Sequence, residues 1–356
     1  MIRVLHVISS LEIGGAQRLV SELLPILKKE GEVEVSILVS RRLHNEFEAT
    51  LEKANIKILS VDSKKNLELS LVCTLFMLRK EYDIIHAHLF PALYLVAIAG
   101  TIGRKKLVYT EHSTTNRRRR HRSFRLIEKY VYSHYNSVIS VSEDVQNCLK
   151  SWLNITSPNN IKFKVVQNGI NCDSYMRERV KGDYDVTLLM VSRFAEAKDQ
   201  ATVIRAMQYI PPNVHVVFIG DGATRHHCEQ FADQLHVNDR VHFMGVQSDI
   251  AYLISKKDIG LLSTRWEGLP LSALEMMAGG LPVLASDVEG VRQVVAGAGI
   301  LFLQGDEKAL ADSINHLITD KDYYRQVAEK CFDRAKKYDI KNTAQRYMDI
   351  YRSLVG

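Results

Sequence analysis

Apolar runs and amphipathic segments alternate along the whole chain. Strands are indicated in the first half at residues 4–8, 33–39, 56–61, 84–85, 107–109 and 138–141. Helical patterns lie between them, and the first carries Val20, Leu23, Leu24 and Leu27 on one face. Further strands are predicted at residues 186–191, 214–219, 241–244, 258–262 and 283–285, with helices at 202–208 and from residue 308 onward. This alternation is typical of parallel, doubly wound α/β sheets.

The pattern divides into two similar units. The polar run 177–185 has the composition of a linker and follows the last elements of the first unit. We therefore expect a first Rossmann-like domain at residues 1–172 and a second at 173–340. Residues 341–356 are expected to form a C-terminal helix that packs back on the first domain.

Size and composition fit this picture. A chain of 356 residues with 46% apolar residues is long enough for two domains with real cores. The five cysteines are scattered and form no CxxC pair, which favours a reducing cytoplasm. The chain starts directly in a predicted strand, so no signal peptide is expected, and the apolar stretch 89–103 is short for a membrane-spanning helix.

One stretch, residues 265–287, organises the second unit. Gly268 gives a flexible loop, Pro270 suits a first helical turn, and the Gly279-Gly280 pair supplies a stop before the next strand. Two carboxylates bracket this helix, Glu267 before it and Glu275 within it.

A helix start is a natural anion site, because its unpaired backbone N–H groups and its dipole both favour negative charge. A carboxylate beside such a site suits the hydroxyls of a neutral group next to a phosphate. Together they suggest a sugar attached to a diphosphate. The alternative is a pair of solvated glutamates on an ordinary helix–strand connection.

A pair of cations, Arg193 and Lys198, follows the strand predicted at 186–191. Ligands of parallel sheets bind beyond the carboxyl ends of the strands, and an arginine fork and a lysine ammonium both suit phosphate oxygens. Solvated loop charges are the alternative.

These motifs, in this order, resemble those of the retaining glycosyltransferases of family 4. Glu267 and Glu275 resemble the paired-glutamate signature, and Arg193 with Lys198 the Arg-x4-Lys element. Similar motifs occur at Gly220-Asp221-Gly222, Phe243-Met244-Gly245, Asn168-Gly169-Ile170-Asn171 (where Asn171 replaces an acid) and Gly14-Gly15-Ala16-Gln17-Arg18. The resemblance covers nearly the whole chain and implies a GT-B fold, with two Rossmann-like doubly wound domains facing a central cleft.

The resemblance also implies roles. Arg193 and Lys198 would hold the diphosphate, Glu275 the ribose, and Glu267 with the backbone of Gly268, Leu269, Pro270 and Leu271 the transferred sugar. Gly245 would meet the nucleobase and Gly15 the donor. His112 would reach the donor sugar, which makes Glu267, His112, Arg193 and Lys198 the expected catalytic set. His86 and His88 would lie on the acceptor side, although a structural role is equally open.

No cofactor or metal is expected. Asp183 and Asp185 have DxD spacing, but they precede a strand and are interpreted as linker. Arg193 and Lys198 already supply positive charge.

The first 180 residues carry 27 Lys+Arg against 18 Asp+Glu, and this excess concentrates between Arg104 and Lys129. Phe124, Leu126, Ile127, Tyr130 and Val131 interleave with these cations, a combination suited to an anionic membrane surface. Nucleic acid or a solvated loop are the alternatives.

The sequence thus predicts a cytoplasmic, peripherally membrane-associated enzyme. It would move a sugar from a nucleotide-diphosphate sugar to a lipid-linked or saccharide acceptor in surface-polysaccharide (capsule or lipopolysaccharide) synthesis. A UDP-sugar is expected because uridine is the commonest donor base of the family. Two alternatives are a nucleotide-sugar epimerase of the same fold and a basic nucleic-acid-binding protein.

Overall fold

The computed structural model describes residues 1–12, 14–61, 67–101, 105–113, 117–156, 162–180, 182 and 184–356. Contacts between Cα atoms divide the chain into two units. Unit 1 comprises Met1–Gly169 and Ile340–Gly356, and unit 2 comprises Ile170–Asp339. These boundaries lie close to the predicted ones at 172/173 and 340/341.

Unit 1 contains a seven-stranded sheet in the order β3-β2-β1-β4-β5-β6-β7, and its paired strands are parallel. The strands are β1 Ile2–Val7, β2 Val33–Val39, β3 Lys57–Ser60, β4 Ile84–His88, β5 Lys106–Glu111, β6 Ser137–Ser140 and β7 Phe163–Val165. The helices of unit 1 are α1 Gly15–Lys29, α2 Glu46–Lys53, α3 Leu67–Leu78, α4 Ala92–Thr101, the 3-10 turn η1 Arg117–Arg120, α5 Phe124–Ser133, α6 Glu143–Leu153 and α15 Ile340–Val355.

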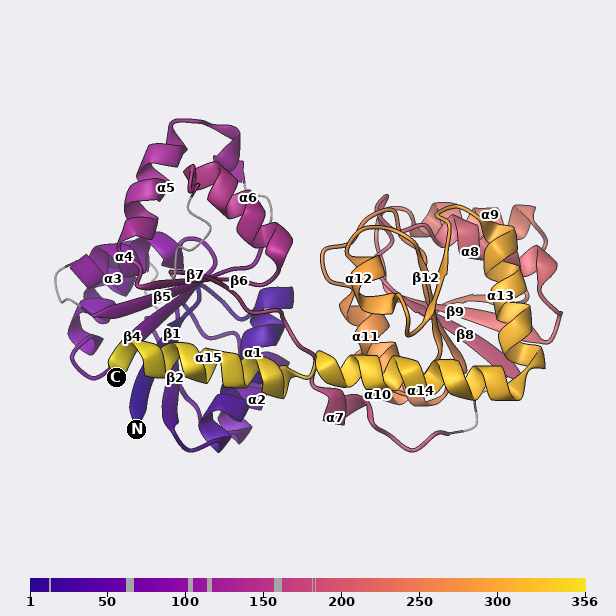
Figure 1. Cartoon of the computed structure of the whole chain (residues 1–356), viewed down its shortest axis with the longest axis horizontal. Helices are drawn as coiled ribbons and strands as arrows, with labels where there is room; N and C mark the ends of the chain where they lie inside the picture. Colours follow the sequence, from indigo (N-terminus) through magenta and orange to yellow (C-terminus); the bar gives the residue numbers. More distant parts are fainter. Residues whose placement is uncertain are drawn as a thin grey trace. The chain divides into compact units, whose positions relative to one another are not determined.

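Side chains of unit 1 alternate between two apolar layers, one on each face of its sheet. Val4, Ile84 and Val108 point to the layer that α1, α2 and α15 cover. Leu5 and Ile85 point to the layer of α3, α4, α5 and α6. The period of two along each strand produces this sorting, because successive side chains leave a strand on opposite faces. Figure 1 shows α15, in yellow, running alongside unit 1 near α1, which it contacts.

Unit 2 contains a six-stranded parallel sheet in the order β10-β9-β8-β11-β12-β13. Its strands are β8 Val186–Val191, β9 Val214–Ile219, β10 Val241–Phe243, β11 Ile259–Leu262, β12 Val283–Ser286 and β13 Ile300–Phe302. Its helices are α7 Cys172–Tyr175, α8 Gln200–Ala206, the 3-10 turn η2 Met207–Tyr209, α9 Arg225–Gln234, α10 Ile250–Ser255, α11 Leu271–Ala278, α12 Val291–Val295, α13 Glu307–Thr319 and α14 Lys321–Lys337. One continuous core joins them.

The predicted fold class is confirmed: each unit is a Rossmann-like, parallel α/β sheet. The three-residue strands β7 and β13 were not predicted. Within the described ranges, no helix is both long and apolar enough to cross a bilayer.

Candidate functional site

In unit 2, two loops that follow neighbouring strands are joined by backbone hydrogen bonds. The loop after β8 and the loop after β11 meet in an antiparallel bridge between Lys198 and Thr264. Arg265 N donates to Ala197 O at 2.8 Å, and Asp199 N donates to Ser263 O at 3.1 Å. This pairing fixes the two loops against each other at the carboxyl edge of the sheet, where ligands of parallel sheets bind.

The bridged loops bring Lys198 and Glu267 together, although 69 residues separate them. Their ammonium and carboxylate form a direct ion pair, and both side chains are largely shielded from solvent. Burial, followed by the charge of Arg193, lowers the pKa of Lys198 to about 8. The adjacent Glu267 carboxylate acts in the opposite direction. The site therefore holds a partly desolvated ammonium within reach of a second cation.

Arg193 is exposed. The buried amide of Gln200 donates to Arg193 O and to Ser192 Oγ, both at 3.1 Å, and so fixes the backbone that carries the guanidinium. Gln200 was not singled out from the sequence.

Both glycines of the Gly220-Asp221-Gly222 motif pack closely against the backbone of this loop. Both have positive φ, and a Cβ would lie 2.1 Å from Ser192 O at Gly220 and 2.2 Å from Phe194 O at Gly222. Only glycine lets the loop after β9 approach so closely. Gly290, which the sequence did not indicate, supports the Glu267 loop in the same way: its φ is +80°, and a Cβ would lie 2.2 Å from Glu267 O.

At the start of α11, the side of Gly268 where a Cβ would stand is open. Pro270 has no N–H, and Leu271 N donates to Leu269 O at 2.9 Å. Among residues 268–271, this leaves the amides of Gly268 and Leu269, for which the described residues offer no hydrogen-bond partner. These two N–H groups can therefore bind a ligand without an existing hydrogen bond having to break. Glu275 is buried within α11.

The predicted nucleobase turn also depends on a glycine. Gly245 has a φ of +67°, and its carbonyl accepts from Gly220 N at 2.8 Å. This bond ties the turn after β10 to the Gly-Asp-Gly motif. The turn, the cation loop and the Glu267 loop therefore form one hydrogen-bonded edge of unit 2.

In unit 1, His112 follows β5. Its Nε2 lies 3.2 Å from His88 Nδ1, whereas its own Nδ1 is shielded from solvent and has no partner among the described residues. Burial lowers the pKa of His112 to about 4, so the ring is neutral near pH 7. Gly15 begins α1, and the side where its Cβ would stand is open.

His86 and His88 have no exposed surface. Burial holds the pKa of both rings well below the usual range. All of their ring nitrogens are hydrogen-bonded inside unit 1. A direct contact with the acceptor, as the sequence suggested, would require these bonds to break.

Two arginines of the predicted basic surface point inward instead. Arg118 donates to the buried Glu128 at 2.9 Å, and Arg119 donates to the buried Glu111 at 2.6 Å. Arg104 lies outside the described residues. The expected basic region is therefore less positive at its surface than the sequence indicated.

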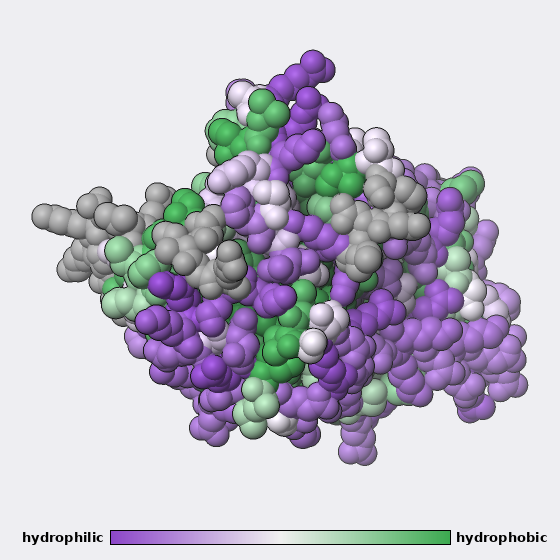
Figure 2. All heavy atoms as spheres, turned by 60° about the vertical axis from the view of Figure 1, so that its left-hand side comes forward, coloured by the Kyte–Doolittle hydropathy of each residue, from purple (hydrophilic) through white to green (hydrophobic). Residues whose placement is uncertain are grey.

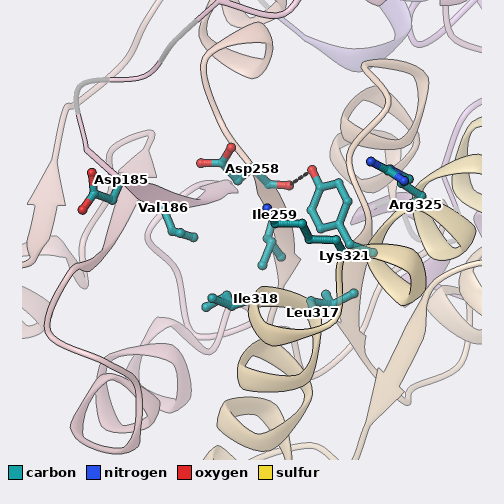
Figure 3. Close-up of a pocket in the computed structure, with 9 residues that line it drawn as sticks. Asp185, Val186, Asp258, Ile259, Leu317, Ile318, Lys321 and Arg325 are labelled. Atoms are coloured by element: carbon teal, nitrogen blue, oxygen red, sulfur yellow. Dashed lines mark hydrogen bonds between the residues drawn. The ribbon is translucent and has the colours of Figure 1, made fainter.

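Figure 3 shows a cavity lined by Asp185, Val186, Asp258 and Ile259 and, from α13 and α14, by Ile318 and Lys321. Asp185 and Asp258 immediately precede β8 and β11, so this cavity lies at the amino edge of the sheet, opposite the bridged loops. Asp185 of the DxD sequence thus faces away from the Lys198–Glu267 pair, whereas Asp183 lies outside the described residues.

Comparison with known proteins assigns the family. Residues 13–174 match the family described as Glycosyltransferase Family 4, and residues 173–336 match Glycosyl transferases group 1. The chain belongs to glycosyltransferase family 4. The predicted family and enzyme class are thereby confirmed.

The names of similar proteins describe related activities. EpsD of Bacillus subtilis, named as a glycosyltransferase, is 26% identical over 76% of each chain. The UDP-Gal:alpha-D-GlcNAc-diphosphoundecaprenol alpha-1,3-galactosyltransferase of Escherichia coli is 24% identical over 80% of this glycosyltransferase and 79% of its own length. The crystal structure of Anabaena HepE in complex with UDP has a TM-score of 0.81 at 21% identity, over 99% of this chain and 100% of that one, and so shares the fold.

Proposed function

We propose that this glycosyltransferase transfers a sugar from a nucleotide-diphosphate sugar bound at the bridged loops of unit 2. The Lys198–Glu267 ion pair is the observation that carries the proposal. It places a desolvated cation beside a carboxylate, next to the open start of α11. A diphosphate fits the cations and the free amides of Gly268 and Leu269 just before α11, and hydroxyls of the sugar fit Glu267.

Donor binding would exchange partners within this pair. The diphosphate takes the Lys198 ammonium, and Glu267 turns to the sugar hydroxyls that neighbour the diphosphate. Arg193 and Lys198 then offset the charge that develops on the departing nucleotide. Glu275 accepts hydrogen bonds from the hydroxyls of the ribose. The anomeric configuration of the transferred sugar is retained. The chain's own cations supply the positive charge, so no metal or cofactor takes part in this proposal.

A UDP-sugar and a lipid-linked acceptor are the preferred substrates. The support comes from similar proteins: the E. coli relative is named for UDP-Gal and a diphosphoundecaprenol acceptor, and HepE was crystallised with UDP. Surface-polysaccharide assembly is the corresponding biological setting.

The donor site can be tested with two matched ion pairs of unit 2. Lys198→Ala and Glu267→Ala remove the site pair, whereas Arg205→Ala and Glu307→Ala remove a partly buried pair between α8 and α13, 3.3 Å long. The site variants should lower turnover by roughly 10²–10³, the effect of losing one preorganised charged group. Lys198→Ala should also abolish the rise in melting temperature that UDP produces, since its ammonium is the group assigned to the diphosphate. Near-wild-type turnover in both site variants would reject the proposal, as would sugar conversion that needs no acceptor, which indicates an epimerase.

We further propose that α5 attaches unit 1 to an anionic membrane surface. Leu126, Ile127 and Tyr130 are exposed by 73%, 50% and 67%. Arg122 and Lys129 are exposed on the same helix and the turn before it. Figure 2 shows hydrophobic and hydrophilic residues side by side at the top of the molecule, at the height where Figure 1 draws α5.

The buried side of α5 is held firmly. Glu128 accepts from Arg118, from Trp152 Nε1 at 2.7 Å and from Tyr94 Oη at 3.1 Å. The apolar side chains are thus presented on a fixed helix. Each exposed cation adds about 1 kcal/mol of attraction to anionic lipid.

Vesicle sedimentation tests this attachment. Leu126→Glu should reduce binding to vesicles containing phosphatidylglycerol by about tenfold or more, since it removes a side chain worth roughly 1.5–3 kcal/mol when buried. Met77→Glu on α3, 69% exposed in the wild type, is the control and should bind normally. Equal binding of both variants would refute the proposal.

A further inference from the structure

In the Lys198–Glu267 ion pair of unit 2, two poorly solvated charges depend on each other. Only 15% of the Lys198 side chain and 18% of the Glu267 side chain are exposed. Among the residues that the structure describes, each head group is the other's one ion-pair partner. An anion that takes the Lys198 ammonium therefore leaves the Glu267 carboxylate in need of other hydrogen-bond donors.

The backbone of Glu267 is held in place, so the carboxylate cannot withdraw with it. Thr264 Oγ1 lies within hydrogen-bond distance, 3.1 Å, of the carbonyl oxygen of Trp266, the preceding residue. Gly290 packs against the Glu267 carbonyl so closely that a Cβ would lie 2.2 Å from its oxygen. The carboxylate can rotate about its own side-chain bonds, but it remains beside Lys198 and beside any anion bound there.

A sugar nucleotide offers this carboxylate new partners. In the proposed donor complex, hydroxyls of the sugar donate hydrogen bonds to Glu267 and replace the bond that it loses with Lys198. The terminal phosphate of the donor is esterified to the sugar and so carries a single negative charge. Glu267 is thus compensated for as long as the sugar is attached.

The nucleoside diphosphate that remains after transfer offers no such partners. As the bond between the anomeric carbon and the terminal phosphate breaks, the phosphate oxygen keeps both electrons, and the acceptor hydroxyl joins the sugar and gives up its proton. A free terminal phosphate loses its second proton with a pKa of about 6, so near neutral pH it carries close to two negative charges. Glu267 then faces more negative charge and has no sugar hydroxyl to bind.

We propose that Glu267 makes this site selective for a nucleoside diphosphate that carries a sugar over the free nucleoside diphosphate that transfer leaves behind. This selectivity rests on the proposed function of the site. It combines an attractive element, the sugar hydroxyls, with a repulsive one, the carboxylate beside the terminal phosphate. The ion pair with Lys198 forms again as the product leaves, so Glu267 weakens product binding as well as orienting the donor sugar.

Loss of the Glu267 charge should therefore have opposite consequences for product and donor. Glu267→Gln keeps the size of the side chain, frees the Lys198 ammonium for a phosphate and removes the repulsion of the product. UDP should bind to this variant about tenfold more tightly than to the wild type, the scale of one hydrogen bond to a charged group. The UDP-sugar should gain no affinity, since its hydrogen bonds to the carboxylate are lost as the ammonium is freed.

Matched controls isolate the charge at this position. UMP lacks the terminal phosphate, so its affinity should be the same in the wild type and in Glu267→Gln. Glu307→Gln breaks the partly buried 3.3 Å ion pair with Arg205 in the same unit and should leave all three affinities unchanged. Glu267→Ala also removes the charge and should shift the affinity for UDP in the same direction as Glu267→Gln, so the test does not depend on one replacement.

Isothermal titration calorimetry of the full-length protein near neutral pH measures these affinities without turnover. The ligands are UMP, UDP and the UDP-sugar that supports transfer by the wild type, chosen among UDP-glucose, UDP-galactose and their N-acetylamino forms. Product inhibition gives a second readout. The inhibition constant of UDP divided by the KM of the UDP-sugar should fall about tenfold in the residual turnover of Glu267→Gln.

Unchanged or weaker UDP binding in Glu267→Gln and Glu267→Ala would overturn the inference. So would an equal gain in affinity for the UDP-sugar, because the variant would then discriminate as the wild type does. Either result leaves the proposed function standing if Lys198→Ala prevents UDP binding. If the wild type binds no UDP, or transfers sugar from none of these donors, the proposed function fails and the selectivity fails with it.

Discussion

Gly290 offers a direct test of how the Glu267 loop is positioned. Its Cα faces the loop so closely that a methyl group there would lie 2.2 Å from Glu267 O and 2.7 Å from Gly268 O. Carbon atoms do not approach backbone below 3.0 Å, so Gly290→Ala must open the contact by about 0.8 Å. Because the neighbours are backbone atoms, the loop carrying Glu267 has to move. A misplacement of about 1 Å in a positioning element costs about 10² in rate.

The substitution also strains the backbone, because alanine at positive φ costs roughly 1–2 kcal/mol. Gly305→Ala provides the matched control: its φ is +79°, close to the +80° of Gly290, but an added Cβ would meet nothing within 4 Å. Both variants should lose stability from strain in thermal melts, and Gly290→Ala should lose more, because its clash with the loop adds to the strain. Only Gly290→Ala should lose about 10² in kcat/KM, measured as sugar transfer from a UDP-sugar. A threefold difference in kcat/KM corresponds to about 0.6 kcal/mol of transition-state stabilisation, which we take as the experimental scatter. If kcat/KM of Gly290→Ala lies within threefold of that of Gly305→Ala, the loop does not depend on this contact.

Three further predictions follow from charged groups. The lowered pKa of Lys198, about 8, predicts that kcat/KM of the free enzyme falls as pH rises through about 8, because the ammonium is lost; Lys198→Arg should abolish this limb of a pH–rate profile. Because the pKa of Lys198 is lower in the folded chain than its usual 10.5, carrying the ammonium penalises the folded state fully below pH 8, and this penalty is lost as the pH rises from 8 to 10.5. In urea titrations the free energy of unfolding of the wild type should therefore rise across that window relative to that of Lys198→Met. Glu128→Ala leaves Arg118 without its buried partner and should cost about 3–5 kcal/mol, whereas Glu32→Ala, which breaks the exposed pair with Arg352, should leave the denaturation midpoint unchanged.

Much of the fold was predictable because its signals are local. The apolar runs of β2, β8 and β9 were predicted to the residue, since each is six or seven residues long and bounded by polar turns. The strands β7, β10 and β13 are each three residues long, and so short a run has no distinguishable period; of the three only β10 was predicted. The neighbourhood of Lys198 and Glu267 followed from their place after two strands of one sheet, which prove adjacent.

Other features depend on distant partners that no local pattern reveals. Arg118 and Arg119 look like surface charges in the sequence, and only the fold brings the carboxylates of Glu128 and Glu111 to them. Tyr347 and Tyr351 have the spacing of any core face of a helix, and their hydroxyl partners are more than two hundred residues away. Gly290 sits in an ordinary turn sequence, and its positive φ is visible only in coordinates.

The return of the chain to unit 1 through α15 has a consequence for biosynthesis. While the ribosome is still making unit 2, the sheet of unit 1 lacks the helix α15, whose Tyr351 hydroxyl bonds the buried His86, and water must hydrate this ring instead. The first domain to emerge is thus the last to be finished, and truncation anywhere before Ile340 should leave a nascent product that chaperones and proteases recognise.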